Sequence, residues 1–153
     1  DTGNASAENN EVRSKEANDP TGDMKIRLEI VQRINEVRAE HGMTALTVNE
    51  SLMSAAQECS QQRFTSHHNQ YECEAALTSG YPHGFNANLT VFTVNASTPI
   101  AQRAVSHWVY SPGHLQNMID AGGQDVGVGV TVDNDRAYCY MLVGDPSSHN
   151  PYE

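Results

Sequence analysis

An alternating run near the C-terminus most constrains how this chain can fold. Residues 125–132 read DVGVGVTV, so valine occupies every second position and therefore one face of an expected strand. Gly127 and Gly129 then lie on the opposite face, where a helix or an aromatic ring is expected to pack tightly against the backbone. A turn at 133–136 joins this strand to residues 137–143 (AYCYMLV), which are expected to pair back as a hairpin.

Helical periodicity dominates the part of the chain that precedes the hairpin. Apolar residues at helical spacing predict a first amphipathic helix from Ile26 to His41, with Gly42 as its stop signal. A second helix is predicted from a cap at Asn49 to about Phe64. The expected order beyond it is a loop, a strand, a helix and a short helix (65–85, 87–94, 100–108 and 115–119). This order favours an α+β fold over alternating βαβ units.

The length of 153 residues favours one domain. Residues 1–22 contain a single large aliphatic residue, Val12, and so offer little surface to bury. We therefore expect a flexible N-terminal tether at 1–22, a folded domain at 23–146 and a C-terminal tail at 147–153.

Charge and cysteine content exclude several classes of partner and site. The formal net charge of −10 disfavours nucleic acid as a partner, because phosphate binding needs a surface of Lys and Arg. No apolar run approaches the roughly 18 residues of a membrane span, and no signal peptide is expected. The three cysteines, Cys59, Cys73 and Cys139, allow one disulfide with a thiol left over or three free thiols. None lies in a C-x-x-C pair, so a structural zinc knuckle is not expected.

Three stretches of the chain match motifs of one known family. They are the segment from the first helix into the second, the run FTSH, and the run HWVYSPGHLQNMIDAGGQDVGVGV (34–62, 64–67 and 107–130). The third is the most specific, because W-x-x-S-P-G-H-x-x-N followed at this distance by G-V-G-V is hard to obtain by chance. On these motifs the chain resembles bacterial members of the CAP superfamily, which comprises cysteine-rich secretory proteins, antigen 5 and pathogenesis-related proteins.

The resemblance implies a three-layer α/β/α sandwich with a central antiparallel sheet. It also implies a groove that typically carries two histidines and two acidic residues. The first histidine corresponds to His67, with His68 as a register alternative, and the second corresponds to His114. The positions of the two acids correspond to Ala87 and to a site near Ser111, so both carboxylates are missing.

The candidate groove residues are therefore His67, His114, His68, His83 and Ser111. His83 lies in the loop that is expected to form the rim of the groove. Ser111 near His114, like Ser66 next to His67, could be taken for a nucleophile and its base. Nothing resembles the nucleophile elbow G-x-S-x-G, so we expect no catalytic residue of this kind.

The same resemblance raises the question of a metal. In family members with the full set of residues, the histidines can bind zinc or another divalent ion. His67 and His114 alone fall short of the three or four protein ligands of ordinary zinc sites, so we expect no cofactor beyond weak zinc binding there. A carboxylate from elsewhere, such as Glu72 or Glu74, would strengthen the metal interpretation if it reached the groove.

We therefore expect a secreted or envelope-anchored CAP-domain protein, monomeric and extracellular, that binds rather than catalyses. The expected partners are a lipid, a small apolar ligand or a surface protein. One alternative is a zinc-dependent hydrolase that acts on peptide or cell-wall material. Another is a purely structural surface protein held by its tether.

Overall fold

The structure is a computed structural model, and it describes residues 24–153. The expected tether at 1–22 lies outside the described residues. The helices and strands follow in this order: α2 (Met24–Glu40), β1 (Thr47–Val48), α3 (Glu50–Gln61), α4 (Asn69–Ser79), β2 (His83–Thr93), α5 (Ile100–Val109), α6 (Pro112–Met118), β3 (Asp125–Asp133) and β4 (Arg136–His149). No helix within this part of the chain is long and apolar enough to cross a bilayer.

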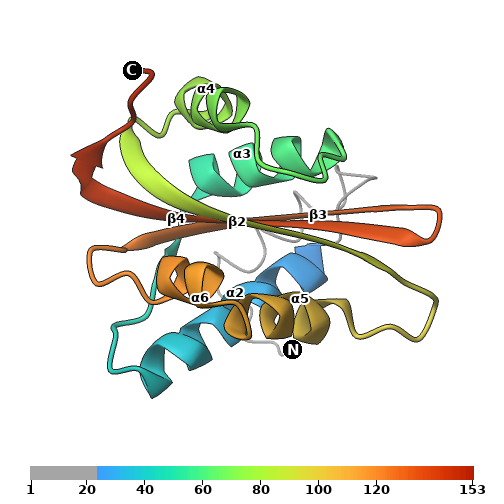
Figure 1. Ribbon diagram of the computed structural model, residues 1–153. Coiled ribbons are helices and arrows are strands. Elements are labelled where there is room, and N and C mark those ends of the chain that lie inside the picture. The colour runs from blue at the N-terminus through green and yellow to red at the C-terminus, as the bar shows by residue number, and fades with distance from the viewer. Residues whose placement is uncertain (1–23) are drawn as a thin grey trace.

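A four-stranded sheet in the order β1-β3-β4-β2 forms the middle layer. β4 pairs antiparallel with both β3 and β2, whereas β1 adds to β3 in parallel through Thr47 and Val48 alone. Helices α3 and α4 cover one face of the sheet, and α2, α5 and α6 cover the other (Figure 1). The expected α/β/α sandwich of the α+β class is confirmed, with one short parallel strand at its edge.

The β3–β4 hairpin explains why valine and glycine alternate in β3. Val126, Val128 and Val130 are buried in the apolar core that the sheet shares with α2 and α5. On the opposite face, a Cβ atom at Gly127 or Gly129 would overlap the backbone of α3. Helix α3 therefore lies directly on the main chain of β3, so the tight packing expected on this face is made by a helix rather than by an aromatic ring.

Two separate apolar cores hold the layers together. One lies between the sheet and α2, α5 and α6 and contains Trp108, which is 1% exposed and therefore a packing residue. The other lies between the sheet and α3 and α4 and contains Leu52 and Tyr140. Each core is closed by a different set of helices, so the sheet is buried on both faces.

Two sequence predictions about secondary structure were wrong. The expected loop at 65–85 contains helix α4, which ends where Gly80 adopts a left-handed conformation with φ of 104°. Its buried positions, Glu72, Cys73, Ala75 and Ala76, mix a charge with small residues and give little apolar periodicity.

The second hairpin strand is also longer than the expected 137–143, because β4 continues to His149 along the whole of β2. Beyond it, the side chain of Asn150 is buried and donates to the carbonyl of Cys73 at 2.9 Å. This bond fastens the end of the described chain to α4. The domain limit at residue 146 stays a prediction.

Candidate functional site

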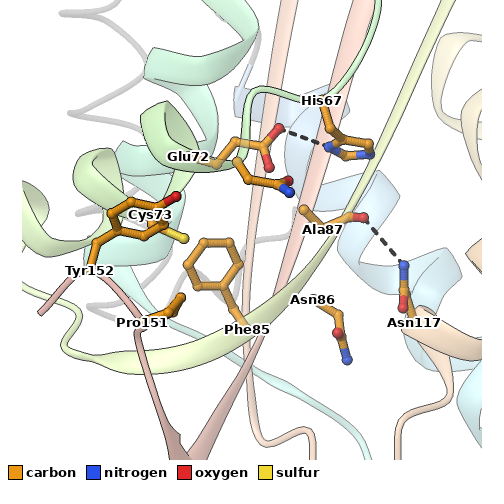
Figure 2. A pocket seen from close by; sticks show the side chains of 10 residues that line it. His67, Glu72, Cys73, Phe85, Asn86, Ala87, Asn117, Pro151 and Tyr152 are labelled. Atoms are coloured by element: carbon orange, nitrogen blue, oxygen red, sulfur yellow. Dashed lines mark hydrogen bonds and ion pairs between the residues drawn. The ribbon is translucent and has the colours of Figure 1, made fainter.

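An open groove lies beside β2, the strand at one edge of the sheet. Its volume is ≈ 860 Å³. Its walls come from the start of α4, the start of β2, helix α6 and the end of the chain, and they include His67, Glu72, Phe85, Ala87, Asn117 and Tyr152 (Figure 2). The groove thus lies at the β2 edge of the sheet, between helices α4 and α6, which belong to opposite outer layers.

Glu72, in the first turn of α4, is the buried centre of the polar contacts in this groove. One of its oxygens, Oε2, accepts hydrogen bonds from His67 Nδ1 at 2.8 Å, from the Tyr140 hydroxyl at 3.0 Å and from the His68 backbone N–H at 3.3 Å. Burial raises the pKa of Glu72, but these bonds outweigh it and hold the pKa below its ordinary value. Glu72 is therefore ionised at neutral pH.

The contact with Glu72 fixes the tautomer of His67. An ionised carboxylate can only accept, so the hydrogen of the neutral imidazole lies on Nδ1 and the unprotonated nitrogen is Nε2. Tyr140 stays a donor, because burial and the neighbouring Glu72 both raise its pKa. The result is an oriented imidazole at the wall of the groove, backed by a buried charge (Figure 2).

His114 belongs to α6, in the opposite helical layer. Its Nδ1 lies 2.8 Å from the hydroxyl of Ser111, the residue that precedes α6. Asn88 of β2 donates to the backbone carbonyl of His114 at 2.9 Å, and Asn117 donates to Asn88 at 2.9 Å, so α6 is bound to the edge strand. The pKa of His114 is lowered by burial first and by the charge of His67 second.

The other two predicted histidines lie elsewhere. His68 stacks on Phe64 with ring centroids 3.7 Å apart and is exposed. His83, at the start of β2, packs edge-on against Tyr81 at 5.3 Å. Among the described residues that line the groove, neither histidine appears. Of the five residues that the sequence predicted for the groove, His67 alone is among its described wall residues. His114 and Ser111 contact each other beside α6 but, like His68 and His83, do not line the groove.

Neither position that the family resemblance assigns to an acid carries a carboxylate, but an acid from a different element contacts His67. Ala87 stands on β2 within the groove, and Ser111 precedes α6, so neither position supplies a carboxylate. Glu72 reaches His67 from α4 instead. The sequence analysis mentioned Glu72 only as a carboxylate that would strengthen the metal interpretation if it reached the groove, because helix α4 was not predicted.

Two further groove contacts were missed. Tyr140 resembled an ordinary hairpin residue, and nothing in its pattern signalled a hydroxyl aimed at Glu72. Asn117 is the last residue of S-P-G-H-x-x-N, so its motif was visible although no role was assigned to it. Its amide donates to Asn88 and, at 3.3 Å, to the carbonyl of Ala87.

The donor set does not make a zinc site on its own. Among residues 24–153, no three His, Cys, Asp or Glu side chains are placed to hold one ion. His67 and His114 offer ring nitrogens, but the near oxygen of Glu72 already accepts three hydrogen bonds. Protein zinc sites use three or four protein ligands, so these residues fall short of that number.

The cysteines are three buried free thiols. Burial is the largest cause that raises the pKa of Cys59 and of Cys139, each to about 12. Burial also raises the pKa of Cys73, which lies on the wall of the groove. All three are therefore protonated at neutral pH and poor nucleophiles.

The lowered pKa of His114 predicts how stability depends on pH. The native protein takes up this proton less readily than the unfolded chain does, so stability falls as the pH drops below the ordinary value of 6.5 toward the lowered pKa. Urea unfolding of wild type and His114→Gln between about pH 7.5 and 5 should show a smaller loss in the variant. Equal losses would mean that His114 titrates as an exposed imidazole.

Comparisons with known proteins agree with this architecture. The family described as CAP, the Cysteine-rich secretory protein family, matches residues 31–145. Among solved structures, the CAP domain of enterococcal PrgA is 17% identical, with a TM-score of 0.63 over 82% of this chain and 62% of that one. An outer surface protein from Borrelia burgdorferi is 18% identical, with a TM-score of 0.57 over 75% of this chain and 89% of that one.

A third solved structure, NaASP2 with Zn²⁺, is 11% identical, with a TM-score of 0.66 over 86% of this chain and 88% of that one. No curated protein sequence matches the chain. The chain spans less than two thirds of the enterococcal protein, and identities this low establish the fold alone. The family match covers most of the chain, although it ends before the last residues of β4 and before Tyr152 of the groove wall. The chain belongs to the CAP, or cysteine-rich secretory protein, family.

Proposed function

We propose that this CAP-domain protein is a non-enzymatic binding module that acts outside the cell or at the cell envelope. The observation that carries this proposal is the open groove of ≈ 860 Å³ beside β2, whose polar side chains already bond to one another. Glu72 is held by His67 and Tyr140, and Asn117 is held by β2. Such a groove offers a shaped surface to a ligand rather than a reactive group.

The extracellular or envelope location rests on the kind of protein that shares this fold. The similar structures include an outer surface protein, and no helix of residues 24–153 could span a membrane. We propose a lipid, a small apolar ligand or a surface protein as the occupant, because Phe85 and Tyr152 give the groove apolar walls beside its polar centre.

The test compares three changes with a fluorescent fatty acid as the probe. Saturable binding should persist within about threefold in His67→Ala and in His114→Ala, because neither imidazole reacts with the ligand. Ala87→Trp should weaken binding at least tenfold, or about 1.4 kcal/mol, by filling the groove. Val132→Trp, at a position 44% exposed near the hairpin turn, is the matched control and should leave binding unchanged.

A zinc-dependent hydrolase is the second candidate, and the hydrogen bond from His67 to Glu72 favours it. Metal-bound imidazoles commonly donate their other nitrogen to a carboxylate, which is the arrangement seen here. This candidate requires one zinc per chain in the purified protein, lost in His67→Ala and His114→Ala, with peptide or cell-wall hydrolysis that chelation abolishes. That result would overturn the non-enzymatic proposal, whereas a protein with neither ligand nor metal would favour a structural surface role.

A further inference from the structure

The two edges of the sheet differ in whether their outward main-chain N–H and C=O groups have hydrogen-bond partners. On β3, the N–H and C=O groups of Val128 and Val130 face away from β4. The side-chain amide of Gln57 bonds to both groups of Val130 at 2.9 Å, and Arg27 donates to the carbonyl of Val128 at 2.8 Å. Buried side chains of α2 and α3 thus close this edge beyond the short strand β1.

The opposite edge, β2, is open. Asn86 and Asn88 pair with β4, so the N–H and C=O groups of Phe85 and Ala87 face outward into the groove. The amide of Asn117 reaches the carbonyl of Ala87. Among the described residues, nothing bonds to the N–H or C=O of Phe85 on this side or to the N–H of Ala87. An edge of this kind is a template for another extended chain.

The chemistry of these open groups selects the type of ligand. Covering a main-chain N–H or C=O group with an apolar molecule leaves that group without a hydrogen-bond partner, which is unfavourable. An extended peptide brings donors and acceptors at the spacing of a strand and satisfies them all. The groups around Phe85 and Ala87 therefore favour a polypeptide main chain over a lipid tail.

Charge narrows the source of that peptide. The chain carries a formal net charge of −10, so a second copy of the same protein would be repelled. Within the groove, Glu72 is ionised, and its lowered pKa keeps it so at neutral pH. A neutral or basic segment of a different protein is the complementary partner.

We propose that such an extended peptide adds to β2 as an outer strand, with its main chain on Phe85 and Ala87. Its alternate side chains would point toward His67 on the α4 side and toward Asn117 on the α6 side (Figure 2). This inference rests on the proposed binding function and names the class of ligand for the same groove.

The experiment uses random heptapeptides displayed on phage and selected on the protein, after which one selected peptide is synthesised. Amide hydrogen exchange, followed by NMR, should slow at least tenfold at Phe85 and Ala87 when that peptide binds. The amides of Asn86 and Asn88 should change little, since they already pair with β4. Two N-methylated versions of the peptide complete the test. Methylation of the amides that face β2 should weaken binding at least tenfold, whereas methylation of the alternate amides, which face solvent, should weaken it less than threefold.

A pair of variants tests the same edge from the protein side. Ala87→Pro removes an outward N–H without breaking a bond to β4, and Ala87→Val keeps that N–H with similar bulk. Binding should weaken at least tenfold in the first and less than threefold in the second. If Ala87→Pro does not fold, the N-methylated peptides decide the question.

Failure of this inference is distinguishable from failure of the proposed function. Protection at other residues, equal binding of both N-methylated registers, or no selected peptide would overturn strand addition. If the fluorescent fatty acid still fills the groove in that case, the binding function stands without the peptide. If neither probe occupies the groove, both proposals fail.

Discussion

Replacing Gly129 by alanine is expected to destabilise the protein by about 3 kcal/mol or more, or to prevent folding. A Cβ at this position would overlap the backbone carbonyl of Ala56 in α3. The obstacle is main chain rather than the end of a flexible side chain, so relief requires α3 to move away from the sheet. Urea unfolding monitored by circular dichroism measures the loss.

Gly113→Ala is the matched control for this prediction. A Cβ at Gly113 meets nothing within 4 Å, and the residue lies in helix α6. Alanine is the better helix former by about 1 kcal/mol, so this variant should be as stable as wild type or slightly more stable. If Gly129→Ala unfolded at the same urea concentration as Gly113→Ala, the direct packing of α3 on β3 would be wrong.

The second large effect is expected from Glu72→Ala. The change removes the acceptor shared by His67 and Tyr140 and leaves the buried Tyr140 hydroxyl without a partner. We expect the free energy of unfolding to fall by about 2–3 kcal/mol, because one partner of a buried pair is removed. The His67 ring keeps partial contact with water, which limits the loss. We also expect the neutral His67 ring to leave the Nδ1–H tautomer, which nitrogen-15 NMR of the ring detects.

The pH dependence follows from the lowered pKa of Glu72. A carboxylate of this kind stabilises the fold above its ordinary pKa of 4.5, and the contribution disappears as the pH falls through the lowered value. The stability difference between wild type and Glu72→Ala should therefore narrow in acid. Glu74→Ala is the control on the same helix: Glu74 is exposed and bonds only to Gln70 among the described residues, so its loss should stay within about 0.5 kcal/mol. Equal losses in the two variants would contradict the central role of Glu72.

Strong local patterns account for the parts of the fold that were predicted correctly. The alternation in 125–132 encodes the strand, its buried face and the close approach of α3. Asn49 caps α3 by accepting a hydrogen bond from the Leu52 N–H, which a sequence signature can show. These elements depend on neighbours in the chain or on a clear period, so one sequence suffices to find them.

The parts that were missed depend on distant contacts. Helix α4 has small and charged residues at its buried positions, so its burial depends on packing against α3 rather than on an apolar stripe. The end of β4 is extended by its pairing with β2, as when Asp145 pairs with Gly84. Neither interaction leaves a local signal.

The candidate site shows the same division. Motifs pointed to His67 and His114, but the contact of His67 with Glu72 required α4, and the contact with Tyr140 required the register of the hairpin. The openness of β2 required knowledge of the strand order. The sequence therefore identified the histidines, but their hydrogen-bond partners became visible only in the folded structure.

The separation of the two apolar cores has an evolutionary consequence. The rims of the groove belong to α4 and α6, which are rooted in different cores on opposite faces of the sheet. Mutations that reshape one rim leave the packing of the other untouched. A lineage can therefore diversify what it recognises one rim at a time, while the strand between them is inherited unchanged.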